Sequence, residues 1–256
     1  MNEYRDFATF YDALTGDVDY AAWAEYILSL LRLHGGDSRQ MLDLACGSGS
    51  LSVELAARGA DMVAVDGSAD MLAIAREKAA DAGADILFLC QDMRELDLYG
   101  TVDSAVCMLD SLSHLLTTDG LAAVFRRLGL FIAPGGLLVF DVNTPHKHAV
   151  TLGNNAFVFE TDELMCVWRN TYEKARRQVT MRLDFFLEDG DVYRRYTDEV
   201  RERAYSMGTW KRLLEEAGFT LLGVYGERSL QPPEENADRW VFVARNRAIY
   251  QSNNGE

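Results

Sequence analysis

The chain has 256 residues, and 48% of them are hydrophobic, which is enough to bury the core of one large domain. It carries 25 lysines and arginines against 40 aspartates and glutamates, and the net charge of −15 disfavours a nucleic-acid partner. The four cysteines lack the spacing of a zinc site or a disulfide framework, and no apolar run approaches the roughly 20 residues of a membrane span. We therefore expect a cytoplasmic protein without a membrane partner.

Residues 1–36 are expected to form an N-terminal lid and a first helix. The helix is predicted over 20–33, because Trp23, Ile27 and Leu30 share one face. Asp19 is its expected N-cap, and two glycines at 35 and 36 end it. Tyr20 and Trp23 could close over a ligand or form the buried face of the helix, and we favour the buried face.

Strands and helices then alternate along the chain. Short apolar strands are predicted over 41–45, 62–65, 86–90, 102–108 and 137–142. Helices are predicted between them over 50–58, 69–80 and 121–132, with Ser68 as the cap of the second, and a Pro-Gly-Gly turn is predicted over 134–136. Nearly continuous apolar strands that alternate with helices are typical of a parallel sheet covered on both faces.

A different pattern follows the fifth strand. Apolar and polar residues alternate over 157–160, 164–172, 179–187 and 192–203, with a hairpin turn at 188–191. We interpret 151–205 as a small antiparallel β insert that forms a substrate roof or the surface of a possible homodimer. A helix over 209–217 and strands over 219–225 and 240–244 complete a main domain of 37–150 and 206–246, followed by a flexible tail over 247–256.

The fold class is therefore α/β. We predict a Rossmann-like, mostly parallel sheet of seven strands with helices on both faces, plus the antiparallel insert after the fifth strand.

The first predicted strand ends in a turn with two glycines, Asp43-Leu44-Ala45-Cys46-Gly47-Ser48-Gly49. Ligands of open α/β sheets bind at the carboxyl ends of strands, and glycine lets the backbone approach them closely. A dinucleotide fingerprint would need a third glycine at position 52, where this chain has Ser52. Asp43 would sit badly beside a pyrophosphate, whereas it suits a cationic amino acid moiety. The turn therefore disfavours a dinucleotide.

Acidic residues also stand at the ends of the next two strands. Asp66 can accept hydrogen bonds from ribose hydroxyls. Asp92 could accept one from the exocyclic amine of an adenine, and Met93 could pack on its ring. The fourth strand ends in Cys107-Met108-Leu109-Asp110-Ser111-Leu112-Ser113-His114, which places polar groups beside the reactive end of such a ligand. Together these positions predict an adenosyl ligand.

These stretches, with Pro134-Gly135-Gly136-Leu137-Leu138-Val139-Phe140-Asp141, resemble the class I S-adenosylmethionine-dependent methyltransferases. Phe10-Tyr11-Asp12 and the insert look like bacterial N-methyltransferases that act on amino-sugar nucleotides or on glycine. The resemblance implies that S-adenosylmethionine is the cofactor and that a small molecule is methylated, at an amine nitrogen.

The resemblance also implies cofactor-binding residues at matching positions. Those residues are Asp43, Ala45, Gly47, Gly49, Asp66, Gly67, Ser68, Met71, Asp92, Met93 and Met108. Asp43 would face the amino group of the methionine moiety, and Asp66 would hold the ribose. Many members of the class have glycine in place of Ala45, so the alanine is expected to reduce the room for the ligand modestly.

An amine must lose its proton before or around attack, so the site needs a proton acceptor. Tyr11 and His114 are the catalytic candidates, with Asp110 and Asn143 as alternatives. His146 and His148 lie two residues apart without a nearby carboxylate cluster. We therefore place both on a polar loop and expect no metal.

A local basic patch is conceivable on the insert. Its candidate residues are Arg194, Arg195, Arg201 and Arg203. Acidic residues alternate with these arginines, so we favour solvated strand positions that pair with nearby acids.

Three other functions stay open at this stage. The same fold can methylate RNA or protein, or it can serve a nicotinamide-dependent oxidoreductase, which Ser52 and Asp43 disfavour. A non-catalytic protein that only senses the cofactor is the last alternative.

Overall fold

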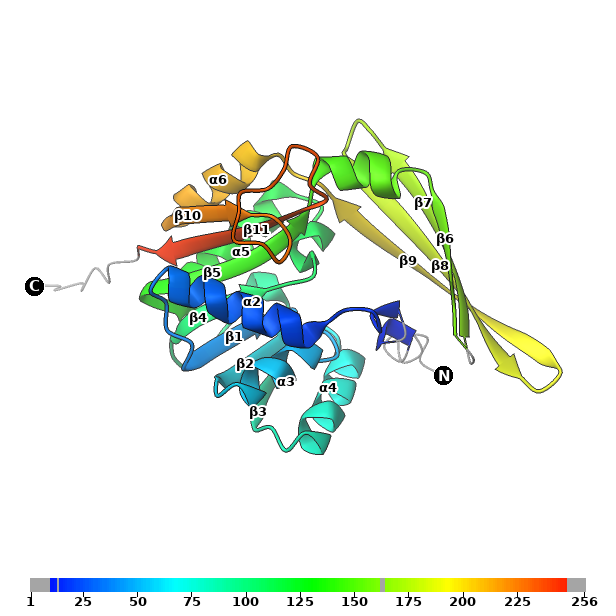
Figure 1. The fold of residues 1–256 in the computed structure, drawn as a ribbon, viewed down its shortest axis with the longest axis horizontal. Helices are drawn as coiled ribbons and strands as arrows, with labels where there is room; N and C mark the ends of the chain where they lie inside the picture. Colours follow the sequence, from blue (N-terminus) through cyan, green and yellow to red (C-terminus); the bar gives the residue numbers. More distant parts are fainter. Residues whose placement is uncertain (1–9, 13, 162–163, 248–256) are drawn as a thin grey trace, which may run out of the picture.

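The computed structural model describes residues 10–12, 14–161 and 164–247. Its main feature is a seven-stranded sheet with the order β10-β11-β5-β4-β1-β2-β3 (Figure 1). The strands are β1 (Gln40–Leu44), β2 (Asp61–Asp66), β3 (Ile86–Cys90), β4 (Val102–Cys107), β5 (Ile132–Asn143), β10 (Phe219–Tyr225) and β11 (Arg239–Asn246). β11 runs antiparallel to both of its neighbours, and the other pairs in this sheet are parallel. The predicted fold class is confirmed.

Helices cover both faces of this sheet (Figure 1). They are α2 (Tyr20–Leu33), α3 (Ser50–Ala57) and α4 (Ala69–Asp81) on one face, and α5 (Thr118–Phe131) and α6 (Met207–Glu216) on the other. Side chains alternate across each strand, so Met41 packs in the core under α2 while Leu42 packs under α5. The expected caps form, because Asp19 accepts a hydrogen bond from the Ala22 amide (2.9 Å) and Ser68 from the Met71 amide (3.3 Å).

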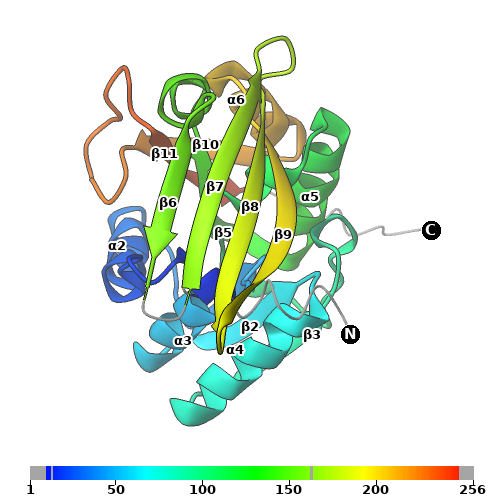
Figure 2. The same cartoon turned by 90° about the vertical axis from the view of Figure 1, so that its right-hand side faces the viewer.

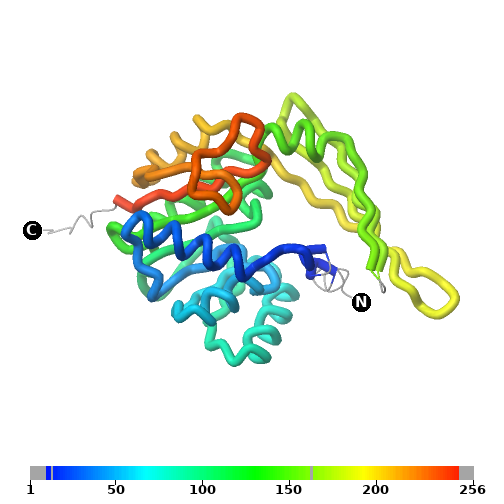
Figure 3. Tube along the Cα trace, viewed as in Figure 1, coloured from blue at the N-terminus to red at the C-terminus, as the bar shows by residue number. Residues whose placement is uncertain are grey.

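A second, antiparallel sheet has the order β6-β7-β8-β9. Its strands are β6 (Ala156–Glu160), β7 (Leu164–Glu173), β8 (Gln178–Asp189) and β9 (Val192–Arg203). Figure 2 shows this sheet standing across the edge of the main sheet. The N-terminal segment runs out toward it (Figure 3), where the Phe10 ring lies 5.0 Å from that of Phe185 and 5.6 Å from that of Tyr196. One face of the insert therefore packs on the N-terminal segment.

Some local expectations differ from the structure. β5 begins at Ile132, so the predicted Pro-Gly-Gly turn lies inside an irregular part of this strand. Glycine is required there, because a Cβ on Gly136 would lie 2.4 Å from the carbonyl oxygen of Asp103. Three short segments were not predicted, namely the 3-10 turns η1 (Met93–Glu95) and η2 (Ser111–His114) and the π-helical η3 (Lys147–Leu152).

Parts of the predicted lid and tail, residues 1–9 and 248–256, lie outside the described residues. Arg247, the first residue of the predicted tail, donates its backbone N–H to the carbonyl oxygen of Gly218 (2.9 Å). Within the described ranges, no helix combines the length and apolar character needed to cross a bilayer.

Candidate active site

The turn after β1 lies where the strand order reverses, with β2 on one side of β1 and β4 on the other. Open α/β sheets bind ligands at this switch point. Three residues of the turn have left-handed backbone conformations, with φ of 61° at Ala45, 54° at Gly47 and 76° at Gly49. The alanine therefore carries a backbone cost, in addition to the reduced room expected from its methyl group.

Asp43 lies at the floor of this turn and is only 2% exposed. The Ser52 hydroxyl donates a 2.6 Å hydrogen bond to its Oδ2 atom. Burial raises the pKa of Asp43 to about 7, and the negative charge of Asp66 adds to this, while the Ser52 hydrogen bond opposes it. A cationic group would stabilise this carboxylate. Ser52, which sequence reasoning treated only as a missing glycine, is therefore a direct partner of Asp43.

Asp66, at the end of β2, organises the same turn. It accepts hydrogen bonds from the backbone N–H groups of Gly47 (2.9 Å) and Ser68 (2.8 Å), one on each carboxylate oxygen. A carboxylate has about four acceptor positions, so both oxygens can still accept from hydroxyl groups. The geometry fits the predicted ribose contact of Asp66.

The remaining residues predicted beside the adenosine lie at the ends of β2 and β3. Asp92 caps η1, and the hydrogen bond from the Arg94 guanidinium holds its pKa below the ordinary range. Met93 is half-buried and packs on the main core, Met71 is buried in α4, and Gly67 is exposed. Their contacts with the cofactor stay predictions.

A narrow cavity opens directly above the turn. Its lining residues are Tyr11, Tyr20, Asp43, Ala45, Cys46, Ser48, Ser50, Leu51, Met108, Leu109 and Ser111. Its volume is about 30 Å³, whereas ligand pockets usually measure about 300–1,000 Å³. The cavity in this conformation is therefore much smaller than a usual ligand pocket. Of the two aromatic residues at the start of α2, Trp23 is buried as preferred, but Tyr20 borders the cavity.

Asp12, the residue that follows Tyr11, anchors Tyr11 above the turn through a hydrogen-bond network. Lys78 of α4 donates hydrogen bonds to Asp12 Oδ1 (2.8 Å), Ser48 Oγ (2.9 Å) and Ser50 Oγ (2.7 Å). Burial, with Tyr20 and nearby aspartates, raises the pKa of Tyr11 far above its ordinary value. The phenol therefore stays neutral, which suits orientation of a ligand better than removal of a proton.

The end of β4 is strained at Leu109 (φ 55°) and Asp110 (φ 54°), in a conformation that such residues rarely adopt. Arg239 Nη2 lies 2.9 Å from Asp110 Oδ1, and its Nη1 pairs with the buried Asp141. The antiparallel register of β11 pairs Arg239 with Asn143 and so brings the arginine to the carboxyl edge. Burial would raise the pKa of Asp110, but Arg239, with smaller contributions from neighbouring cations, holds it below its usual range.

A buried polar cluster lies where the insert rejoins the main sheet. Glu202 Oε2 accepts a hydrogen bond from Asn143 Nδ2 (2.9 Å) and lies 3.0 Å from His148 Nε2. The expected polar-loop position is wrong for His148, because η3 buries this residue completely. His114 ends η2 as an exposed residue and contributes to the electrostatic field at Asp110.

Arg239 and Glu202 were not among the site residues predicted from the sequence. Glu202 occurs in a run of alternating charges, and its burial depends on the return of β9 to the main sheet. The only available signal was its place near the end of an amphipathic strand.

Comparisons with known proteins agree with this geometry. A family model described as "Methyltransferase domain" matches residues 41–136. A "Putative methyltransferase" of Geobacillus sp. (strain WCH70) is 32% identical over 244 residues, which cover 94% of this chain and 99% of that protein. A solved S-adenosylmethionine-dependent methyltransferase from Clostridium acetobutylicum ATCC 824 has a TM-score of 0.85 and 31% identity, covering 95% of this chain and 99% of that chain. The chain belongs to the S-adenosylmethionine-dependent methyltransferases.

Two relatives of this methyltransferase are N-methyltransferases of small molecules. The glycine/sarcosine N-methyltransferase of Parasynechococcus marenigrum (strain WH8102) is 28% identical, covering 95% of this chain and 84% of that protein. The dTDP-3-amino-3,6-dideoxy-alpha-D-glucopyranose N,N-dimethyltransferase of Streptomyces fradiae is 32% identical, covering 48% of this chain and 47% of that protein. The predicted resemblance is confirmed, and S-adenosylmethionine is the cofactor, so the nicotinamide alternative is not supported.

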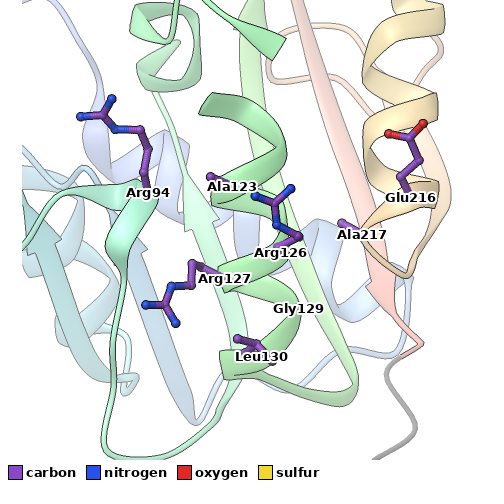
Figure 4. Close-up of a pocket in the computed structure, with 8 residues that line it drawn as sticks. All are labelled: Arg94, Ala123, Arg126, Arg127, Gly129, Leu130, Glu216 and Ala217. Atoms are coloured by element: carbon purple, nitrogen blue, oxygen red, sulfur yellow. The ribbon is translucent and has the colours of Figure 1, made fainter. Parts of the chain in front are cut away.

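A wider pocket of about 480 Å³ lies elsewhere on the methyltransferase, between η1, α5 and α6 (Figure 4). Its lining residues are Arg94, Ala123, Arg126, Arg127, Gly129, Leu130, Glu216 and Ala217. Figure 4 shows that its three arginines point in different directions. They therefore do not form a convergent anion site.

The conceivable basic patch on the insert is largely neutralised. Arg194 pairs with Asp189, Arg195 with Asp184 and Arg201 with Glu199, as favoured from the sequence. Arg203 differs, since it donates a 2.8 Å hydrogen bond to the carbonyl oxygen of Leu116.

Replacing Gly49 with alanine should damage the turn of the methyltransferase. The new Cβ would lie 2.7 Å from the Ala75 Cβ, in a backbone conformation that already favours glycine. We expect a loss of about 2–4 kcal/mol in the free energy of unfolding, and weaker S-adenosylmethionine binding in calorimetry. Gly59→Ala is the matched control, because its φ is 95° but nothing lies within 4 Å of the added atom. Equal effects of the two substitutions would show that packing against α4 is unimportant.

Proposed function

We propose that this methyltransferase transfers a methyl group to an amine nitrogen of a small molecule. The observation that carries the proposal is the roof over the cofactor turn. Phe10 of the N-terminal segment packs against Leu183 and Phe185 of the insert, and the next residue, Tyr11, lines the cavity above Asp43. A closed site of this kind suits a compact acceptor, and the N-methyltransferase relatives support an amine.

The chain's own residues supply alignment and exclusion of water. S-adenosylmethionine brings a methyl group that is already activated, so an in-line approach and a dry site account for most of the catalysis required. Asp43 and Asp66 would hold the cofactor, and Tyr11 would separate it from bulk water. Tyr11 and His114 stay the predicted catalytic candidates, and the neutral Tyr11 phenol suits orientation of a ligand better than removal of a proton.

An RNA or protein acceptor is less well supported. The net charge of −15 repels a phosphate backbone, and three of the four arginines of the conceivable basic patch pair with acids of the insert. The cytoplasmic location and the possible homodimer stay predictions, and gel filtration with light scattering would test the second.

A labelling experiment tests the proposed function. The protein is incubated with methyl-labelled S-adenosylmethionine and a metabolite extract, and labelled products are identified by mass spectrometry. We expect a labelled N-methyl compound of low molecular mass. Label that passes only to tRNA or protein would contradict the proposal, as would S-adenosylmethionine binding without any turnover, which would indicate a sensor.

A further inference from the structure

Asn143, His148 and Glu202 form a buried cluster where the insert meets the main sheet, with the less buried Asp110 at its edge, and these four residues are called the acceptor cluster below. We propose that this acceptor cluster is the subsite that binds the amine of the small molecule, with Glu202 as the group that receives its proton. The proposal rests on the proposed N-methylation and names the residues that would carry it out.

The acceptor cluster is deeply buried. Glu202 is 4% exposed, Asn143 is 3% exposed and His148 is 0% exposed. These residues come from three separate elements, β9, β5 and η3, and all meet at the Glu202 carboxyl. Burying a carboxyl group is costly unless it is paired or hydrogen-bonded. Arg239 of β11 forms its ion pairs with Asp110, Asp141 and Glu227, not with Glu202.

Two polar atoms of the acceptor cluster are left without a protein partner. Among the described residues, Asn143 Oδ1 and His148 Nδ1 are buried and make no hydrogen bond. Asn143 Oδ1 belongs to the same amide whose nitrogen contacts Glu202, so it must lie close to that carboxyl. An ammonium group has three donors, and an amide oxygen and a carboxylate are acceptors suited to it. An unfilled acceptor beside a buried acid therefore suits a cation.

The acceptor cluster lies beside the cofactor cavity. Leu109 and Ser111, the residues on either side of Asp110, line the cavity above the cofactor turn. The Asp110 carboxylate pairs with Arg239, whose register partner in β5 is Asn143. An amine bound by Glu202 would therefore lie at the same carboxyl edge of the main sheet as the cofactor turn.

The proton step needs a carboxylate beside the bound ammonium. The Glu202 carboxyl, held by Asn143 and His148, is placed to supply it. During the reaction one N–H proton passes to the Glu202 carboxylate, and its bonding electrons stay on nitrogen as the lone pair that attacks the methyl carbon, while the methyl–sulfur bond breaks and leaves its electrons on sulfur. His148 and Asn143 act as positioning residues, because they hold the Glu202 carboxyl.

Other charged groups face the acceptor cluster and must be considered in any pH profile. Lys147 of η3, His114 of η2 and Arg239 of β11 all favour the ionised form of Asp110. They keep the Asp110 carboxylate ionised, so Asp110 remains a negative charge at the edge of the acceptor cluster.

A binding experiment tests the subsite without cofactor or acceptor. Histidine imidazole signals of the ¹⁵N-labelled protein are recorded while methylammonium chloride is added, with potassium chloride at equal ionic strength as the reference. We expect His148 signals to shift with millimolar affinity in the wild type, and this response to be lost in Glu202→Gln. An unchanged His148 signal in the wild type would overturn the proposal.

A kinetic experiment uses the acceptor found by the labelling screen. Glu202→Gln should lower kcat/KM about 100-fold and alter its pH profile, while the affinity for S-adenosylmethionine stays unchanged. Glu202→Asp should restore part of the loss. Glu199→Gln, at an exposed position of the same strand, is the matched control and should retain normal kinetics.

The outcomes separate the subsite from the proposed function. A folded Glu202→Gln protein with unchanged kcat/KM and pH profile would show that the acceptor cluster only holds the insert in place. If Glu202→Gln fails to fold, His148→Asn gives the same test. We expect kcat/KM to fall about 10-fold and its pH profile to change, whereas a purely structural role would leave the pH profile unchanged. If the screen finds no amine product, the proposed function fails, while the methylammonium titration still decides whether the subsite binds a cation.

Discussion

Asp43→Asn should abolish detectable S-adenosylmethionine binding and should stabilise the ligand-free protein above pH 7. The folded protein holds the pKa of Asp43 at about 7, against an ordinary value of 3.8, because the carboxyl is buried. The predicted contact with the ammonium group of the methionine moiety needs the ionised form of Asp43. Asparagine keeps the size and can still accept from Ser52, but it cannot supply the charge.

The pH dependence follows from the same shift. Between about pH 4 and pH 7 the folded state binds more protons at Asp43 than the unfolded state does, so the free energy of unfolding falls as the pH rises. A difference of about three pKa units sets an upper bound of about 4 kcal/mol on this loss. Wild-type affinity for S-adenosylmethionine should rise between pH 6 and pH 8, because more of Asp43 is then ionised.

Thermal denaturation at pH 5.5 and pH 8, with isothermal titration of S-adenosylmethionine, checks both effects. Asp61→Asn is the control, because Asp61 begins the neighbouring strand at the opposite edge of the sheet and is exposed. Tight S-adenosylmethionine binding by Asp43→Asn, or a pH-independent wild-type affinity, would show that Asp43 does not face the cationic group.

Replacing Arg239 with methionine should destabilise the protein by about 3–5 kcal/mol. Arg239 forms ion pairs with Asp110 and the fully buried Asp141, and its own side chain is only 9% exposed. Methionine keeps much of the apolar stem but leaves both carboxylates without a counterion. The free energy of unfolding, measured in urea, should fall accordingly, and the Tm should fall by about 10 °C.

A second substitution shows whether charge causes this loss. Asp141→Asn in the Arg239→Met background should recover part of the stability, because one of the unpaired buried charges is removed. Arg212→Met is the surface control, since Arg212 is about half exposed in its pair with Glu216 and should change stability by less than about 1 kcal/mol. An equal effect at Arg212 and Arg239 would argue against a special role for the buried pair.

Local sequence patterns accounted for most of the fold. The range predicted for β3 agrees with the structure, and so do those for β9 and β10. The two predicted N-cap residues, Asp19 and Ser68, also accept backbone hydrogen bonds from the helices that they cap. These features depend on neighbouring residues, because side-chain alternation, capping and turn preference act over a few positions. The irregular start of β5 was missed because it depends on pairing with β4.

The cofactor side of the site was largely visible in the sequence. Asp43, Gly47, Gly49 and Asp66 follow strands β1 and β2, and parallel strands bring their carboxyl ends to the same edge. The partner of Asp43 was not visible, because the relation of Ser52 to Asp43 depends on how α3 turns back over β1.

The sequence by itself determined the fold class, the switch point and the acids predicted to face the adenosyl ligand. Only the tertiary structure decided the buried polar contacts, where Arg239 meets Asp141 across 98 positions and Glu202 meets Asn143 across 59. Such buried polar partners are brought together by the order and register of strands, which local propensity does not encode. A buried charge makes those pairings necessary, because it is costly to leave without a partner.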